Sequence, residues 1–297
     1  MDISSLSFRS AKGLVFSLSL LALCMNLFAW SGLNVRPLAK GKSDLAPGES
    51  GTYYQLSDNE RKELVWMAKA AKAAYEKESK PLGYRSFSRA EWDVVAEGCD
   101  DIVYTEDGYF RIGDSGLRGR LMVNMLNEGR VILALSGTDF GLEEIMSGET
   151  AKDAIASVHH YFSKKQCVNQ YRQALKVMNG VLSFKQRSEV WIVGHSLGGS
   201  LTTYLALNLP RGRTKIKCAT FNGYGVSKLL RTTDEDVELA NSRVRNVYCE
   251  GDLVYKIPAR HFGASYSIKV KGLWLKQHSL DNMLNVMIEH RTKWKGL

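Results

Sequence analysis

Short apolar stretches alternate with polar ones along most of the chain, and their periods predict the secondary structure. Residues 131–135 (VILAL) are continuously apolar, which is typical of a central strand buried on both faces. They follow a turn at residues 127–129 (NEG), and residues 119–126 before that turn complete a predicted hairpin. Further strands are predicted over residues 189–193, 217–221, 244–249 and 266–270.

Apolar residues at helical spacing occupy the segments between these strands. A first helix is predicted over residues 57–77, where Ser57 and Glu60 form the pattern of a capping box. Because strands alternate with helices, we expect an α/β fold with a mostly parallel central sheet and helices on both faces. The other predictions are helices over residues 158–182, 200–209 and 279–289, short strands and turns over 80–117, and a lid or cover loop over 139–157.

The N-terminus carries a separate pattern. Arg9 and Lys12 precede an uncharged, mostly apolar stretch over residues 13–35, as in a secretory signal or an uncleaved membrane anchor. Positive residues before such a stretch stay on the inner side of the membrane, so either alternative exports the rest of the chain. The predicted parts are a signal peptide or N-terminal membrane anchor over residues 1–31, a linker over 32–55, and one α/β domain over 56–297 outside the cytoplasm.

Composition narrows the choice of partners. The chain has 297 residues and a formal net charge of +9, which serves either attraction to an anionic membrane surface or solubility. It has no zinc-ligand pairs, no basic arm with interleaved aromatic residues and no phosphate-binding glycine-rich loop, so we expect no metal and no nucleic-acid partner. The cysteines beyond the N-terminal stretch either form disulfides or stay free; they are Cys99, Cys167, Cys218 and Cys249.

Residues 194–199 (GHSLGG) carry the strongest chemical signal. The pattern Gly-x-Ser-x-Gly follows a predicted strand and precedes a predicted helix, which is the context of a nucleophile elbow. Ser196 occupies the tight turn of such an elbow, and Gly194 and Gly198 leave room for its backbone. The helix points its N-terminal amides at the site, so the N–H of Leu197 can stabilise an oxyanion. The alternative is an ordinary glycine-rich loop with a solvated serine.

A serine nucleophile needs a histidine base and an acid that orients the base. In a fold with this elbow, both follow the serine in the chain, on loops after later strands. Asp252 follows a predicted strand through a tight turn and is the predicted acid, with Glu250 as a substitute. His278, just before the last predicted helix, is the first choice of base. His261 is the second choice, and His290, at a helix end, is the third.

The oxyanion also needs a second donor, which in this fold comes from the loop after an earlier strand. Thr138 follows the apolar strand over residues 131–135 and is the predicted donor. Gly137 allows the backbone to turn there, and the threonine hydroxyl offers a further donor. Thr138 and Leu197 together form the predicted oxyanion hole.

In their order along the chain, these motifs resemble those of the class 3 lipases and their lipase-like relatives. The segments that carry the resemblance are 134–138 (ALSGT), 194–199 (GHSLGG), 220–225 (TFNGYG) and 251–254 (GDLV), with His278 behind them, and 169–175 (NQYRQAL) is similar to the helix before the elbow. The resemblance covers residues 60–290. Such lipases usually have Arg-Gly-Thr where this chain has residues 136–138 (SGT), and Asp-Pro-Val where it has 252–254 (DLV).

The resemblance implies an α/β-hydrolase fold, acyl-ester hydrolysis without a cofactor, and a lid that moves at a lipid surface. It implies the triad Ser196, Asp252 and His278, with Thr138 and Leu197 as oxyanion donors. We therefore expect an exported lipase or phospholipase whose partner is a lipid or another acyl ester, associated with a membrane surface. The alternatives are an esterase or thioesterase for small esters, a non-catalytic hydrolase-like binding protein, and a toxin-like effector that acts on another cell's membrane.

Overall fold

The computed structural model describes residues 50–75, 80–99, 101–113, 115–137, 165–184, 187–226, 232–256 and 260–292. The predicted signal peptide or anchor, the linker up to residue 49 and the predicted cover loop lie outside these ranges. Residues 50–55, predicted as the end of the linker, belong to the folded domain instead, because Ser50–Thr52 pair with a strand of the sheet and Tyr53 is fully buried. Within the described ranges, no helix has both the length and the apolar character needed to cross a membrane.

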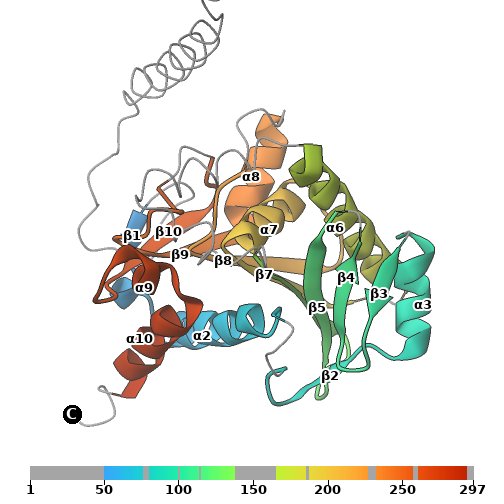
Figure 1. The fold of residues 1–297 in the computed structure, drawn as a ribbon, viewed down its shortest axis with the longest axis horizontal. Coiled ribbons are helices and arrows are strands. Elements are labelled where there is room, and N and C mark those ends of the chain that lie inside the picture. The colour runs from blue at the N-terminus through green and yellow to red at the C-terminus, as the bar shows by residue number, and fades with distance from the viewer. Residues whose placement is uncertain are drawn as a thin grey trace, which may run out of the picture. The chain divides into compact units, whose positions relative to one another are not determined.

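The centre of the domain is a ten-stranded sheet in the described part of the chain (Figure 1). Its order is β1-β10-β9-β8-β7-β6-β5-β4-β3, and β2 pairs with β5 beside this path. The strands are β1 (Ser50–Thr52), β2 (Tyr84–Ser86), β3 (Ile102–Tyr104), β4 (Tyr109–Ile112), β5 (Leu117–Asn124), β6 (Arg130–Leu135), β7 (Glu189–His195), β8 (Lys215–Phe221), β9 (Val244–Cys249) and β10 (Ala264–Ile268).

The sheet is parallel from β1 to β6 along this order and antiparallel from β6 to β3. The predicted hairpin is β5 and β6, paired from Gly119 with Leu135 to Val123 with Val131. The carboxyl ends of β6, β7, β8 and β9 therefore lie along one edge of the sheet, as in other parallel α/β sheets. This edge carries the residues that follow each of those strands.

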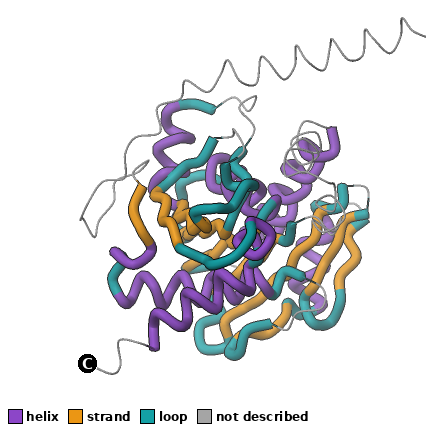
Figure 2. The backbone as a smooth tube through the Cα atoms, turned by 60° about the vertical axis from the view of Figure 1, so that its left-hand side comes forward, coloured by secondary structure: helices purple, strands orange, loops and turns teal. Residues whose placement is uncertain are grey.

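Helices cover both faces of the sheet, as predicted, and Figure 2 shows the strands between them. The first apolar cluster joins the sheet to α3, α6, α7 and α8, and the second joins it to α2 and α10. The helices are α2 (Asp58–Lys72), α3 (Arg89–Glu97), α6 (Lys165–Phe184), α7 (Leu197–Asn208), α8 (Asp234–Arg243), α9 (Trp274–His278) and α10 (Leu280–Thr292), with a 3-10 turn at Tyr53–Gln55.

The central strands show why their sequence is apolar throughout. In β6, Val131, Leu133 and Leu135 belong to the first cluster, whereas Ile132 and Ala134 belong to the second. Successive side chains of a strand point to opposite faces, so a strand with a core on each side needs apolar residues at every position. The burial of alternate β6 side chains in the two clusters confirms the prediction of a central strand buried on both faces.

Several predicted boundaries shift. The first helix has the predicted capping box at Ser57 but ends at Lys72, and β7 continues through His195, so that α7 begins at Leu197 rather than at residue 200. The segment 80–117 contains a helix, α3, besides its strands. The helices α8 and α9 were not predicted, because α8 is mostly polar and α9 has five residues, too few to show a period.

Two of the four cysteines can be assigned a state. Cys218 and Cys249 are buried free thiols, and burial raises the pKa of each to about 12. A thiol with such a pKa stays protonated at neutral pH and packs as a small apolar side chain. These two cysteines therefore belong to the core rather than to a disulfide.

Candidate active site

The chain turns sharply at Ser196, between β7 and α7. Ser196 has φ 57° and ψ −123°, a conformation that strains a residue other than glycine. Its N–H donates to the carbonyl of Phe221 over 3.2 Å, and its own carbonyl accepts the N–H groups of Gly199 and Tyr224 over 3.0 and 3.1 Å. These three hydrogen bonds connect the strained turn to the carboxyl end of β8, to the loop after β8 and to the first turn of α7. The geometry is that of the predicted elbow.

The two glycines around Ser196 are required by close backbone contacts. A Cβ at Gly194 would overlap the carbonyl of Gly198, and a Cβ at Gly198 would overlap the carbonyl of Leu135 at the end of β6. Any side chain at these positions would push the elbow away from the sheet. The spacing Gly-x-Ser-x-Gly thus follows from how tightly the turn packs.

Asp252 and His278 form a buried pair at the same edge of the sheet. Nδ1 of His278 lies 2.9 Å from Oδ2 of Asp252, and Oδ1 of Asp252 accepts the N–H of Val254 over 2.7 Å. An ionised carboxylate only accepts hydrogen bonds, so Nδ1 of His278 carries the proton and Nε2 presents a lone pair. Within the described residues, this buried Nε2 has no hydrogen-bond partner.

The other two histidines proposed from the sequence are placed differently. His261 packs its ring on Tyr255, with 4.2 Å between centroids, and its Nε2 lies 3.2 Å from the Tyr255 carbonyl. Burial lowers the pKa of His261 to about 4, with the Tyr255 carbonyl opposing that shift. His290 belongs to α10, and its side chain lies outside the described part of the structure. Of His278 and His261, the structure pairs His278 with Asp252.

The prediction that His278 lies on a loop was wrong. It is the last residue of the short helix α9, and the loop lies before this helix. The consequence is small, because the helix ends at His278 and its side chain still reaches Asp252. The carbonyl of His278 is then free to accept side-chain donors, as the last carbonyls of a helix commonly are.

His195 links the elbow to His278. Its Nε2 lies 2.8 Å from the His278 carbonyl, its Nδ1 lies 2.7 Å from the hydroxyl of Tyr75, and this hydroxyl accepts the N–H of Gly137 over 3.3 Å. Because a carbonyl can only accept, Nε2 of His195 donates, Nδ1 accepts, and Tyr75 is the donor to it. The pKa of His195 is lowered to about 3, mainly by burial and to a smaller extent by the nearby His278, so this ring is neutral.

Asn222 and Gln277 complete the support of the His278 backbone. Nδ2 of Asn222 donates to the carbonyls of Gln277 and His278 over 2.7 and 3.1 Å, and its Oδ1 accepts the N–H of Cys249 over 2.8 Å. The side chain of Gln277 lies against Gly251, where any Cβ would overlap it. The turn before Asp252 and the residue before His278 are therefore packed directly together.

The two predicted oxyanion donors have different outcomes. Leu197 is the first residue of α7, and the first N–H groups of a helix have no partner within it, so this amide is available to a ligand. Thr138 lies outside the described residues. The residue before it, Gly137, is directly beside the elbow: a Cβ there would lie 3.2 Å from Cβ of Ser196. The N–H of Gly137 is already used by Tyr75.

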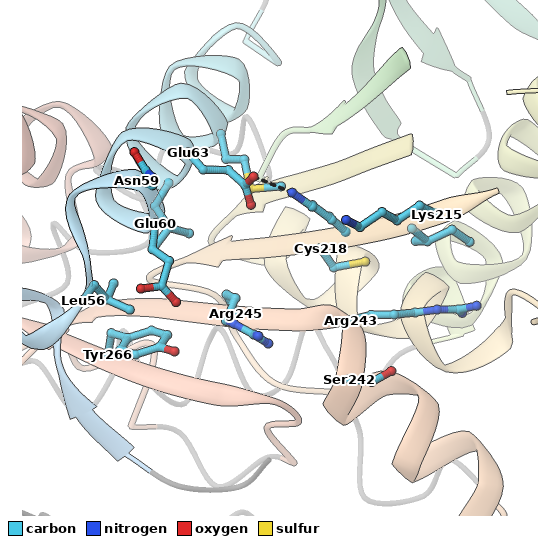
Figure 3. A pocket seen from close by; sticks show the side chains of 14 residues that line it. Leu56, Asn59, Glu60, Glu63, Lys215, Cys218, Ser242, Arg243, Arg245 and Tyr266 are labelled. Carbon is cyan, nitrogen blue, oxygen red and sulfur yellow. Dashed lines mark hydrogen bonds and ion pairs between the residues drawn. The ribbon is translucent and has the colours of Figure 1, made fainter. Parts of the chain in front are cut away.

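A pocket of about 440 Å³ lies away from this arrangement (Figure 3). It is lined by residues of α2 and by the amino ends of β8 and β9, with Lys217 paired to Glu63 in its wall. Ser196, Asp252 and His278 follow the carboxyl ends of their strands and do not line it. Among the described residues, no group of three or more His, Cys, Asp or Glu side chains is arranged to hold a metal ion.

A strained serine between a parallel strand and a helix, with an aspartate and a histidine after later strands, defines an α/β-hydrolase. A family model described as a Tle-like phospholipase domain matches residues 66–288. The chain belongs to this family, and the predicted lipase-like membership is confirmed. The domain is therefore that of a lipase-like hydrolase of lipid esters.

Solved lipases are similar to the chain at low identity. Lip2 lipase from Yarrowia lipolytica has 14% identity and a TM-score of 0.46, over 72% of this chain and 80% of that one. A triacylglycerol lipase from Penicillium expansum has 13% identity and a TM-score of 0.44, over 74% of this chain and 89% of that one. The M37 lipase has 13% identity and a TM-score of 0.40, over 78% of this chain and 80% of that one. No curated protein sequence matches the chain.

Three residues of the arrangement were not found from the sequence: Tyr75, Asn222 and Gln277. In the sequence, Tyr75 is only one more apolar position near the end of the predicted helix over residues 57–77, and His195 is only a member of the elbow motif. Asn222 stands in the segment TFNGYG that carries part of the resemblance. Asparagine is one of the few residues other than glycine that readily adopt a positive φ, and the structure gives it a φ of 46° there. Their roles depend on contacts between distant segments: Tyr75 lies 120 residues before His195, and Asn222 lies 55 residues before Gln277.

Proposed function

We propose that the chain is an exported phospholipase that hydrolyses acyl esters through an acyl-Ser196 intermediate. The observation that carries this proposal is the His278 ring, which is fixed by Asp252 at Nδ1 and presents a buried Nε2 lone pair without a partner in the described residues. The ring centroid of His278 lies 4.9 Å from that of His195, the residue directly before Ser196. The base is thus held beside the elbow in the tautomer that general-base catalysis requires.

The proposed reaction has two halves. Nε2 of His278 takes the proton of the Ser196 hydroxyl while Oγ attacks the ester carbonyl, and Asp252 stabilises the imidazolium that forms. The N–H of Leu197 stabilises the tetrahedral oxyanion, with Thr138 proposed as the second donor. The imidazolium then protonates the leaving alcohol, and Ser196 keeps the acyl group. Water, activated by the same histidine, attacks the acyl-enzyme and releases the fatty acid.

Phospholipid is the proposed substrate for two reasons. The family is named for a phospholipase domain, and the chain carries a net charge of +9, which favours an anionic lipid surface over neutral oil. Export follows from the basic and apolar N-terminal pattern of residues 1–31. Recovering the protein outside the cytoplasm and sequencing its N-terminus tests the export proposal. A chain found only in the cytoplasm would contradict it.

The central test is Ser196→Ala, assayed on long-chain phospholipid vesicles and on a p-nitrophenyl ester. We expect the rate to fall by a factor of order 10³ or more with the fold retained. An organofluorophosphonate should label Ser196 in the wild type and leave the variant unlabelled. The matched control is Ser183→Ala, at an exposed serine near the end of α6. Wild-type hydrolysis by Ser196→Ala would refute the proposed function.

The choice of ester is tested with a panel of substrates. Phospholipid, triacylglycerol, short-chain ester and thioester are compared at equal acyl concentration. The proposal expects phospholipid to have the highest kcat/KM. A preference for water-soluble esters would instead identify an esterase.

A further inference from the structure

The segment that joins β10 to α9 and continues into that helix presents an apolar side chain among lysines. Leu273 is 79% exposed, and Lys269, Lys271 and Lys276 of the same segment are exposed as well. We call residues 269–276 the rim loop. Most exposed apolar side chains on a protein surface are isolated and need no explanation, but this one stands in a lysine-rich segment five residues before His278.

The rim loop lies at the edge of the sheet that carries the candidate active site. It follows the carboxyl end of β10, which runs parallel to β9, and β9 in turn runs parallel to β8 and β7. Ser196 and Asp252 follow β7 and β9 at that same edge. Figure 1 shows α9 beside the end of β10. A surface that meets the rim loop therefore meets the side of the domain from which Ser196 is approached.

Hydrogen bonds hold the rim loop in one shape. Nε2 of Gln277 donates to the carbonyls of Val270 and Gly272 over 3.3 and 3.0 Å. The carbonyl of Leu273 accepts the N–H groups of Lys276 and Gln277 over 2.9 and 3.2 Å. Since Gln277 is also held by Asn222 through its own carbonyl, the loop is fixed to the backbone that positions His278. Its shape does not have to be formed on binding, so little ordering entropy opposes docking.

The charges of the rim loop favour an anionic surface. Lys271 and Lys276 stand on either side of Leu273 in the sequence. Glu250 is an acidic neighbour of the strand before the loop: its N–H donates to the carbonyl of Ile268, and its carboxylate accepts the Ser267 hydroxyl. The rim loop itself contains three lysines and neither Asp nor Glu, so its own charge is positive. A leucine that enters the headgroup region while lysine stems extend toward lipid phosphates is a common mode of interfacial binding.

We propose that the rim loop docks the enzyme on an anionic phospholipid bilayer, with Leu273 inserted between headgroups and Lys271 and Lys276 on lipid phosphates. This inference rests on the proposed function, since a phospholipid ester is presented in a bilayer. Beyond the proposed function, it names the part of the chain that contacts the bilayer and the charge of the lipid that this part binds. Docking through this loop brings the His278 side of the domain to the surface that holds the substrate.

The first experiment measures binding without catalysis. The full chain carrying Ser196→Ala is sedimented with vesicles of phosphatidylcholine alone and with vesicles containing one quarter phosphatidylglycerol. We expect tighter binding to the anionic vesicles, and Leu273→Asp should weaken it about tenfold. The pair Lys271→Glu and Lys276→Glu should weaken it similarly and reduce its dependence on salt.

The chain offers a matched control for Leu273→Asp. Leu126 is 97% exposed in the turn between β5 and β6, at the amino end of β6 and thus at the opposite edge of the sheet. Leu126→Asp introduces the same charge there and should leave vesicle binding unchanged. Equal binding by Leu273→Asp and the parent, or an equal loss in Leu126→Asp, would overturn the inference.

The second experiment separates docking from chemistry. In the chain with Ser196 intact, Leu273→Asp should lower hydrolysis of anionic vesicles about tenfold and leave hydrolysis of a monomeric short-chain ester unchanged. Loss of both activities would mean that Leu273 acts on the site itself and would overturn docking. A change of oligomeric state in Leu273→Asp, measured by light scattering, would assign the loop to a protein interface. Failure of the proposed function appears separately, as hydrolysis that survives Ser196→Ala.

Discussion

The hydroxyl of Tyr75 lies 2.7 Å from Nδ1 of His195 and joins the segment after α2 to the residue directly before Ser196. Through this contact, three hydrogen bonds run in one direction, from the Gly137 N–H to Tyr75, from Tyr75 to His195, and from His195 to the His278 carbonyl. The chain of bonds connects the end of β6, the elbow and the histidine paired with Asp252. It is a means of keeping these three parts in register.

Tyr75→Phe should therefore lower kcat more than it changes KM. The substitution leaves the N–H of Gly137 and Nδ1 of His195 without a partner in a buried place, which costs about 1–3 kcal/mol of stability. We expect kcat on a monomeric ester to fall roughly tenfold as His278 loses its alignment with Ser196. Urea unfolding and steady-state kinetics measure the two effects.

The control is Tyr53→Phe, which removes a hydroxyl that donates to the Arg61 carbonyl, away from Ser196. It should reduce stability without a comparable loss of kcat. Equal kcat for Tyr75→Phe and the wild type would show that the Tyr75–His195 contact is structural only.

The identity of the base is tested with two alanine variants. His278→Ala removes the side chain that Asp252 orients, and ester hydrolysis should fall by a factor of order 10³ or more. His261→Ala removes a ring that packs on Tyr255, and it should keep most of the activity at some cost in stability. Rates on a p-nitrophenyl ester and circular dichroism of both variants decide between them. Full activity in His278→Ala would transfer the role to His261.

Gly251→Ala tests the packing between the two turns that carry Asp252 and His278. The added Cβ overlaps the end of the Gln277 side chain, which must then swing away and lose its bonds to Val270 and Gly272. We expect a loss of about 1–2 kcal/mol in the free energy of unfolding.

A double-mutant cycle gives the sharper result. In a Gln277→Ala background the obstacle is absent, so Gly251→Ala should cost clearly less there than in the wild type. Gly113→Ala, at a glycine with open space around its would-be Cβ, is the control without effect. Additive costs in the cycle would mean that Gly251 is required for another reason.

Stability should depend on pH through the buried histidines. The pKa of His261 in the folded chain is lowered by burial to about 4, against an ordinary value of 6.5, so the unfolded chain binds a proton first as the pH falls. Stability is therefore complete above pH 6.5 and decreases toward pH 4 at about 1.4 kcal/mol per pH unit for this group. His195, with a pKa lowered to about 3, acts in the same direction.

His261→Gln removes one of these titrating groups and keeps a donor for the Tyr255 carbonyl. The difference in unfolding free energy between pH 7 and pH 5 should be about 2 kcal/mol smaller in the variant than in the wild type. Urea titrations at both values measure it. An unchanged difference would mean that His261 is accessible to protons in the folded chain.

The sequence by itself determined the parts of this protein that depend on local order. The elbow at Ser196 is visible because a strand, a glycine-spaced turn and a helix follow each other directly. The apolar run over residues 131–135 predicts its own burial on both faces, and Ser57 with Glu60 marks the start of α2. The order of acid and base also follows from the chain, which left Asp252 with three histidines to choose from.

Only the tertiary structure selected among those histidines. His278 and His261 are both near a strand end in the sequence, and the difference is which ring the fold turns toward Asp252. The contacts of Tyr75 with His195 and of Gly251 with Gln277 join segments that are distant in the chain. Local periodicity reports which face of a strand or helix is buried. It cannot report which buried side chain meets which, because that is decided when separate elements pack against each other.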